Sequence, residues 1–156
     1  MASHTFTVVS SLSVDDAFDR LIDLEQVTAW DEGVRGSVRI DHADGATPDS
    51  TGAVVEGSRF EVTVTGFDGT PDTVVYEITD ASRPDRFVMV GENATFRATD
   101  ELSLHATGTG SELTYVGRLE LLGDDRPLTD AQLDSMFPKI AAVAQTGLTT
   151  FLNPPA

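Results

Sequence analysis

Between Val34 and Leu122, apolar residues recur at every second position in several short segments that are separated by turn-forming sequences. In "RFEVTVTGF", for example, Phe60, Val62 and Val64 alternate with charged or hydroxyl side chains. A two-residue period is typical of a strand that buries one face. The segments "FDGTPD", "DASRPD" and "TGTGS" supply turns, and none leaves room for a crossover helix. The pattern predicts about six antiparallel strands that share one apolar face.

The chain ends on a segment with a helical period, "LTDAQLDSMFPKIAAVAQTGLTTFL". Thr129 and Gln132 have the spacing of a capping box at its start. Pro138 either kinks this helix or marks a break near Phe137. The apolar positions with helical spacing are Leu133, Met136, Phe137, Ile140, Ala141, Ala144, Leu148, Phe151 and Leu152. This is the only large element available to cover the apolar face of the sheet.

The N-terminal part predicts one strand and two short helices. Residues 5–10, "TFTVVS", have the composition of a strand, and "SVDDAFDRLID" follows with Ser13 as its N-cap. A second short helix is expected from about Leu24 to Trp30. The chain is therefore predicted to be an α+β protein and one domain, residues 1–156. Its curved antiparallel sheet of about six to seven strands would wrap around one long C-terminal helix.

Charge and composition exclude several function classes. The formal net charge is −16, and Lys139 is the only lysine. Binding to nucleic acid or to an anionic membrane needs clustered basic residues, so we expect neither partner. Such acidity favours solubility, and it is also consistent with a salt-adapted source.

Other sequence signals point to a cytoplasmic protein that needs no metal or cofactor. There is no cysteine, no signal peptide and no apolar run of about 18 residues, so we expect no membrane insertion. His4, His42 and His105 lack the spacing of metal ligands. Nucleotide-binding and nucleophile-elbow motifs are missing as well. We expect a monomer or a homodimer.

The order of elements and several motifs resemble the START-like (SRPBCC) superfamily, the helix-grip fold, in its polyketide cyclase/dehydrase-type branch. The resemblance covers nearly the whole chain. Its carriers are "SVDDAFDRLIDLEQVTAWDEGV", "GSRFEVTVTGF", "RPDRFVMVGEN" and "TDELSLHATGTGSELTYVGRLELLG". One difference is that members of the family have a proline near the Asp-Leu-Glu motif, whereas this sequence has Val27 and Thr28 there. The resemblance implies a deep, largely apolar cavity between sheet and helix. Members bind lipids, polyketides, hormones or other hydrophobic compounds, and a minority catalyse cyclisation or dehydration.

Asp100 is the carboxylate of greatest interest. In "FRATDELSL" it shares a strand face with Phe96, Ala98 and Leu102, so it points into the cavity if that face is the inner one. A desolvated carboxylate there would have a raised pKa and could act as a general base or bind a polar ligand group. The alternatives are a bulge near Thr99 that turns it outward, or pairing with an arginine.

Tyr76 and Tyr115 share parity with apolar strand residues. They are either core tyrosines that reach the rim or groups that orient a ligand. Arg97 shares parity with Glu101 and is interpreted as part of a surface ion pair rather than as an anion clamp.

Trp30 is the only tryptophan, in the acidic stretch "DLEQVTAWDEGV". Leu24, Val27 and Trp30 would form an apolar edge, with Asp31 and its acidic neighbours facing water. Trp30 is then either a wall of the cavity or a plug at the end of the core. The predicted ligand-binding residues are Trp30, Val38, Phe60, Val62, Tyr76, Met89, Phe96, Asp100, Leu102, Tyr115, Phe137, Ile140 and Ala144.

Together these features favour binding of a small hydrophobic molecule, lipid-, polyketide- or aromatic-like, in an internal cavity. The alternative is a polyketide cyclase or dehydratase that uses Asp100 as a base and Tyr76 or Tyr115 as a proton donor. A third possibility is an adaptor protein whose core is closed and filled.

Overall fold

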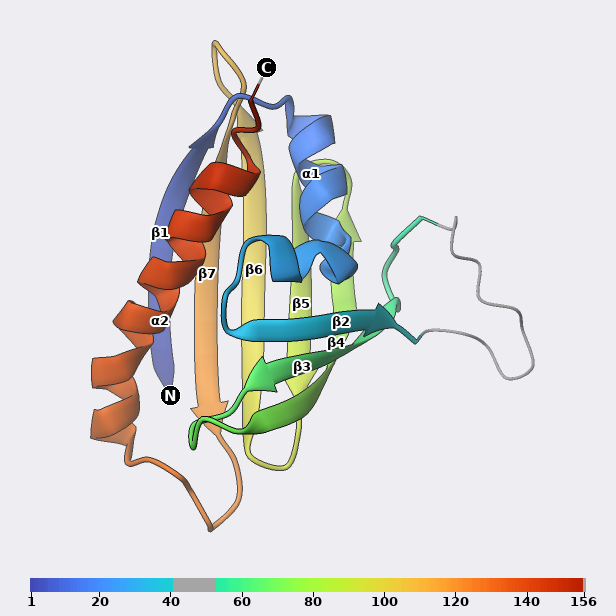
Figure 1. The fold of residues 1–156 in the computed structure, drawn as a ribbon. Coiled ribbons are helices and arrows are strands. Elements are labelled where there is room, and N and C mark those ends of the chain that lie inside the picture. Colours follow the sequence, from blue (N-terminus) through green and yellow to red (C-terminus); the bar gives the residue numbers. More distant parts are fainter. Residues whose placement is uncertain (41–52, 156) are drawn as a thin grey trace, which may run out of the picture.

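The computed structural model describes residues 1–40 and 53–155, which form an antiparallel sheet, two α-helices and a 3₁₀ helix (Figure 1). The sheet has seven strands in the order β1-β7-β6-β5-β4-β3-β2. The elements along the chain are β1 (Ala2–Ser10), α1 (Val14–Ile22), η1 (Leu24–Ala29), β2 (Val34–Arg39), β3 (Arg59–Thr65), β4 (Pro71–Ser82), β5 (Arg86–Glu92), β6 (Phe96–Ala106), β7 (Ser111–Leu121) and α2 (Asp130–Phe151). The predicted fold class is confirmed.

The sheet is strongly curved. In Figure 1, β6 and β7 run from top to bottom, whereas β2, the edge strand of the sheet, runs across them. The helix α2 packs against β1 and β7, η1 packs against β2, and α1 packs against β6 and β7. The concave face is thus covered by α2 on one side and by α1 and η1 on the other.

The predicted caps of the helices are present. Ser13 caps α1 by accepting a hydrogen bond from the backbone N–H of Asp16, and Thr129 and Gln132 form the predicted capping box of α2. Pro138 lies inside α2, which continues to Phe151, so the break near Phe137 is not observed. The side chains that α2 buries are Leu133, Ala141, Ala144 and Leu148.

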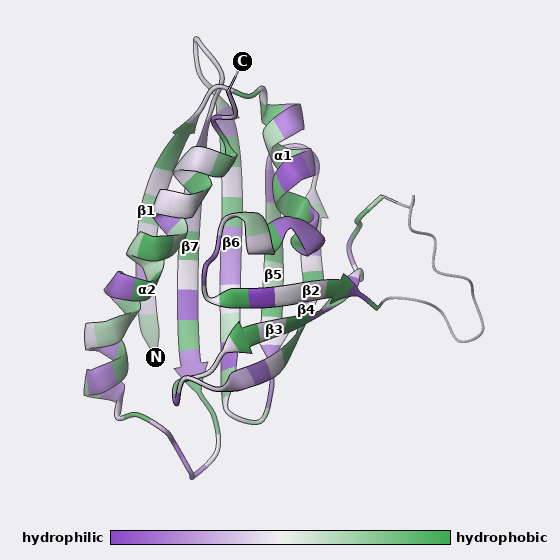
Figure 2. Cartoon of the chain, in the orientation of Figure 1, coloured by the Kyte–Doolittle hydropathy of each residue, from purple (hydrophilic) through white to green (hydrophobic). Residues whose placement is uncertain are grey.

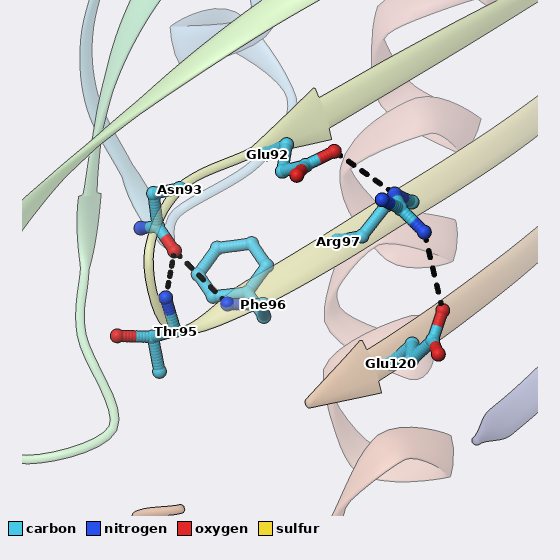
Figure 3. Close-up of polar contacts among 6 residues, drawn as sticks. All are labelled: Glu92, Asn93, Thr95, Phe96, Arg97 and Glu120. Carbon is cyan, nitrogen blue, oxygen red and sulfur yellow. Dashed lines mark hydrogen bonds and ion pairs between the residues drawn. The ribbon is translucent and has the colours of Figure 1, made fainter. Parts of the chain in front are cut away.

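The two faces of the sheet differ as the alternation predicts. Along β6 and β7, buried residues alternate with half-buried ones, and Figure 2 shows the matching bands of hydropathy. Ion pairs occupy the outer face: Arg97 pairs with Glu92 and Glu120 there (Figure 3). Arg97 is therefore in a surface ion pair as predicted, although Glu101 pairs with Arg86 instead. The convex face is solvated, and any internal site must lie on the concave face.

The expected inward orientation of Val38 is wrong. Val38 is 61% exposed, and the reason is a register shift between Val34 and Gly36 in the pairing of β2 with β3. A bulge adds one residue to a strand and reverses the faces beyond it. Val34 lies opposite Val64, but beyond the bulge it is Ser37 that lies opposite the buried Val62.

Within the described parts of the chain, none of the helices combines the length and the apolar character that a membrane span requires.

Candidate functional site

An internal cavity of about 200 Å³ lies between the concave face of the sheet and α2. Its walls come from β1, β4, β6 and β7, from the middle of α2, from residues 31–34, and from the end of β3 with the turn that follows it, residues 64–67. The lining is mainly apolar, and this is the composition of most small-molecule sites.

A smaller chamber of about 40 Å³ adjoins this cavity under η1. Its apolar walls are Leu24, Val27, Trp30, Val62 and Met89. Both spaces are lined by Val34 and by four polar residues: Asp31, Tyr76, Asp100 and Tyr115. The polar groups therefore converge where the main cavity meets the deeper chamber.

Asp100 points inward, and the predicted alternative of a bulge near Thr99 does not occur. It is 9% exposed and lies in regular register, opposite Met89 on β5 and Gly117 on β7. A Cβ at position 117 would lie only 3.3 Å from Oδ1 of Asp100 and 3.4 Å from Cζ of Phe137. The glycine thus leaves the carboxylate open to the cavity, between β7 and α2.

The two tyrosines are held by close packing. The ring of Tyr115 stacks on Phe6 at a centroid distance of 4.9 Å, and Trp30 meets it edge-on at 6.4 Å. The ring of Tyr76 lies across Gly91 on β5, where a Cβ would come within 2.4 Å of Cζ of the tyrosine. A residue other than glycine at 91 would displace this ring, so Gly91 fixes the position of Tyr76.

Asp31 is the site residue that the sequence did not reveal: it was expected to face water, but it is only half-exposed and also lines the cavity. It follows η1, and its side chain accepts a hydrogen bond of 2.9 Å from the backbone N–H of Gly33. This turn holds the carboxylate against both the main cavity and the deeper chamber. The helical phase could not predict this position because η1 is a 3₁₀ helix that ends at Ala29, before Asp31. The local sequence signal that could have identified Asp31 is the turn formed by Asp31, Glu32 and Gly33.

Burial dominates the acid–base properties of these groups. It raises the pKa of Asp100 to about 7, an increase that the Tyr115 hydroxyl reduces by hydrogen bonding and that the charge of Asp31 reinforces. Burial also raises the pKa of Asp31, against the hydrogen bond from Gly33. The pKa values of Tyr76 and Tyr115 are raised by burial and by the nearby carboxylates. Near neutral pH, Asp100 can therefore accept or release a proton while both tyrosines remain hydrogen-bond donors.

The other residues predicted for the site divide into three groups. Phe96, Phe137, Ile140 and Ala144 line the main cavity. Trp30, Val62 and Met89 line the deeper chamber. Phe60 and Leu102 are fully buried in the core but border neither space, because they pack in its solid part.

Phe96 is positioned by the turn between β5 and β6. The side-chain oxygen of Asn93 accepts hydrogen bonds from the backbone N–H groups of Thr95 and Phe96, at 2.9 and 3.0 Å (Figure 3). The ring of Phe96 then meets Phe67 edge-on at a centroid distance of 5.9 Å. Both aromatic residues line the main cavity, and Phe67 belongs to the segment 64–67 that borders it.

Trp30 combines features of both predicted roles. It is 4% exposed and belongs to the main core, and it also lines the deeper chamber. Its Nε1 is buried without a hydrogen-bond partner. Among residues 1–40 and 53–155, no group of three or more histidine or carboxylate side chains is placed to hold a metal ion.

Solved structures with the same fold cover almost the whole chain. A START superfamily protein from Mycobacterium smegmatis has a TM-score of 0.73 at 12% sequence identity, with 97% of this chain and 95% of that one covered. Ara h 8.0201 has a TM-score of 0.62 at 15% identity, over 97% and 98% of the two chains. The di-domain ARO/CYC StfQ from the steffimycin biosynthetic pathway has a TM-score of 0.66 at 15% identity, and the match covers 97% of this chain and 50% of StfQ.

The sequence matches none of the curated proteins. A family model does match it: the model described as polyketide cyclase/dehydrase and lipid transport covers residues 1–150. The match spans nearly the entire chain and agrees with the START-like fold of the solved structures. The chain therefore belongs to the polyketide cyclase/dehydrase and lipid transport family.

Proposed function

We propose that the protein binds a small, largely apolar molecule in the cavity between the sheet and α2. The observation that supports this most directly is an internal space of about 200 Å³ with mainly apolar walls and four polar residues at its deep end. Burial of apolar ligand surface would contribute roughly 25 cal/mol per Å², less the costs of ordering the ligand. Asp31, Tyr76, Asp100 and Tyr115 would fix its orientation. An adaptor with a filled core is disfavoured, since the core contains this cavity.

Filling the cavity from α2 should weaken binding. We expect Ala144→Leu to weaken the affinity for the neutral fluorescent probe N-phenyl-1-naphthylamine by about tenfold or more, because the added side chain enters the space that the ligand needs. The measurement is a fluorescence titration, with circular dichroism to verify the fold.

Ala142→Leu is the matched control, since Ala142 lies on the same helix but is exposed. It should leave the affinity unchanged. Equal weakening by both substitutions would place the probe on the surface and contradict an internal site.

The second candidate function is catalysis, a cyclisation or dehydration of a polyketide-like substrate. It is favoured by the contact of the Asp100 carboxylate with the Tyr115 hydroxyl and by a pKa of about 7 for Asp100. In this mechanism Asp100 would take a proton from a carbon or hydroxyl of the substrate, and Tyr115 or Tyr76 would donate one to the developing oxyanion.

Asp100→Asn separates the two functions. An enzyme should lose turnover of a polyketide-like substrate with this variant and retain the affinity of the substrate. If a panel of such substrates binds to the unmodified protein and none of them is converted, the result would support binding alone.

A further inference from the structure

The side chain of Trp30 contains a buried hydrogen-bond donor whose partner the described residues do not supply. Its ring is 4% exposed, and Nε1 has no acceptor among these residues. Buried N–H groups in native proteins almost always have a partner. The ring lines the deeper chamber of about 40 Å³, whose other walls are largely apolar: Leu24, Val27, Val34, Val62 and Met89. An acceptor for this N–H therefore has to come from a guest in the chamber.

The same chamber presents an acceptor that has free capacity. Asp100 lines it, and this carboxylate accepts a hydrogen bond from the hydroxyl of Tyr115. An ionised carboxylate has about four lone-pair sites, so one bond from Tyr115 leaves room for a second donor. Gly117 keeps the carboxylate open on the side of the main cavity. The chamber thus combines one unused donor with one partly used acceptor.

The size of the chamber limits the group that can satisfy both. A space of about 40 Å³ holds a polar group of one or two heavy atoms, so a single group has to serve Trp30 and Asp100. A carbonyl oxygen accepts but cannot donate, and an ammonium donates but cannot accept. A carboxylate would place a second negative charge beside Asp100. A hydroxyl accepts and donates through one oxygen, and it carries no charge.

We propose that Trp30 and Asp100 determine ligand specificity together, and that they select a hydroxyl group at the end of an apolar ligand. The ligand oxygen accepts a hydrogen bond from Nε1 of Trp30, and its O–H donates to the carboxylate of Asp100. The apolar body occupies the main cavity. This inference rests on the proposed binding function and specifies its ligand class, a lipophilic alcohol or phenol.

The indole N–H reports on this contact directly. Trp30 is the only tryptophan, so the ¹⁵N-labelled protein gives a single indole N–H signal. Two probes share one ring, 2-(2-naphthyl)ethanol and 2-propylnaphthalene, and the second has a methyl group in place of the hydroxyl. At pH 8 Asp100 is mostly ionised, since its pKa is about 7. We expect the alcohol to move the signal downfield and to slow its hydrogen exchange about fivefold relative to the hydrocarbon.

Substitutions at the two residues test which of them the hydroxyl contacts, with affinities measured by displacement of N-phenyl-1-naphthylamine. Asp100→Leu replaces the carboxylate by methyl groups of similar shape, and it should weaken binding of the alcohol about tenfold without weakening that of the hydrocarbon. Replacement of Trp30 by 3-(3-benzothienyl)alanine exchanges the N–H for sulfur, and it should weaken the alcohol alone, about fivefold. Asp124→Leu removes a charge at an exposed position and should change neither affinity.

The outcomes separate this inference from the function on which it rests. If both probes bind and move the indole signal equally, or if neither moves it, the hydroxyl contact is overturned while hydrophobic binding stands. Slow exchange of the N–H in the ligand-free protein, unchanged by the alcohol, would assign its partner to a bound water and would also overturn the inference. Failure of both probes and of N-phenyl-1-naphthylamine to bind counts against the inference and the function alike. If the variants do not fold, the spectra of the unmodified protein decide.

Discussion

Replacing Gly147 with alanine should destabilise the protein by about 3 kcal/mol, although alanine is the better helix former by about 1 kcal/mol. The helix α2 passes so close to the chain after η1 that a Cβ at position 147 would lie 1.8 Å from the backbone oxygen of Trp30. Backbone atoms cannot rotate away as a side chain does, so α2 and η1 must separate. Denaturant unfolding measures the change, with a lower midpoint at unchanged slope as the expected result.

Separation of α2 from η1 should also disturb the site, since Trp30 and Asp31 follow η1 directly. Binding of N-phenyl-1-naphthylamine should therefore weaken along with stability. Gly108→Ala is the control: it lies in the turn between β6 and β7, where an added Cβ meets nothing within 4 Å. A Gly147→Ala variant as stable as the unmodified protein would show that α2 and η1 do not approach as closely as described.

The sequence predicted the parts of the fold that depend on periodicity. A two-residue alternation along residues 96–106 sufficed to place Asp100 on the inner face, because β6 pairs with both neighbours without a bulge. The capping box at Thr129 located the start of α2, since that signal is local. Tyr76 and Tyr115 followed from the same parity argument, and the structure brings them to the border of one cavity.

Features that break a period were not predicted. The bulge after Val34 reversed the face of Val38. The helical phase predicted that Asp31 faces water, but η1 is a short 3₁₀ helix that ends before Asp31, so this phase does not apply there. The roles of Gly91, Gly117 and Gly147 were also beyond reach. Each depends on what lies opposite in space, namely Tyr76, Asp100 and the backbone of Trp30. A sequence alone does not contain such tertiary distances.

Asp100→Asn should stabilise the protein at pH 8 by up to about 4 kcal/mol and should have no such effect near pH 4. The pKa of Asp100 is raised by burial from 3.8 to about 7 in the folded state, so the folded protein retains a proton that the unfolded chain releases. A raised carboxyl pKa makes stability fall as pH rises from the unfolded value to the folded one, by about 1.4 kcal/mol per unit. The loss thus develops between about pH 4 and pH 7 and is complete above it. Asparagine has a similar shape and no charge to bury.

The measurement is the difference in the free energy of unfolding between variant and unmodified protein, followed by denaturant titration from pH 4 to pH 8. Contributions from acids that do not interact with Asp100 cancel in this difference, and Asp124→Asn, at an exposed position, should give a flat line. A flat difference for Asp100→Asn as well would mean that the carboxylate is solvated rather than buried. Buried charges that lower stability near neutral pH are concentrated at functional sites, so the expected slope would support a role for Asp100 in ligand binding or activity.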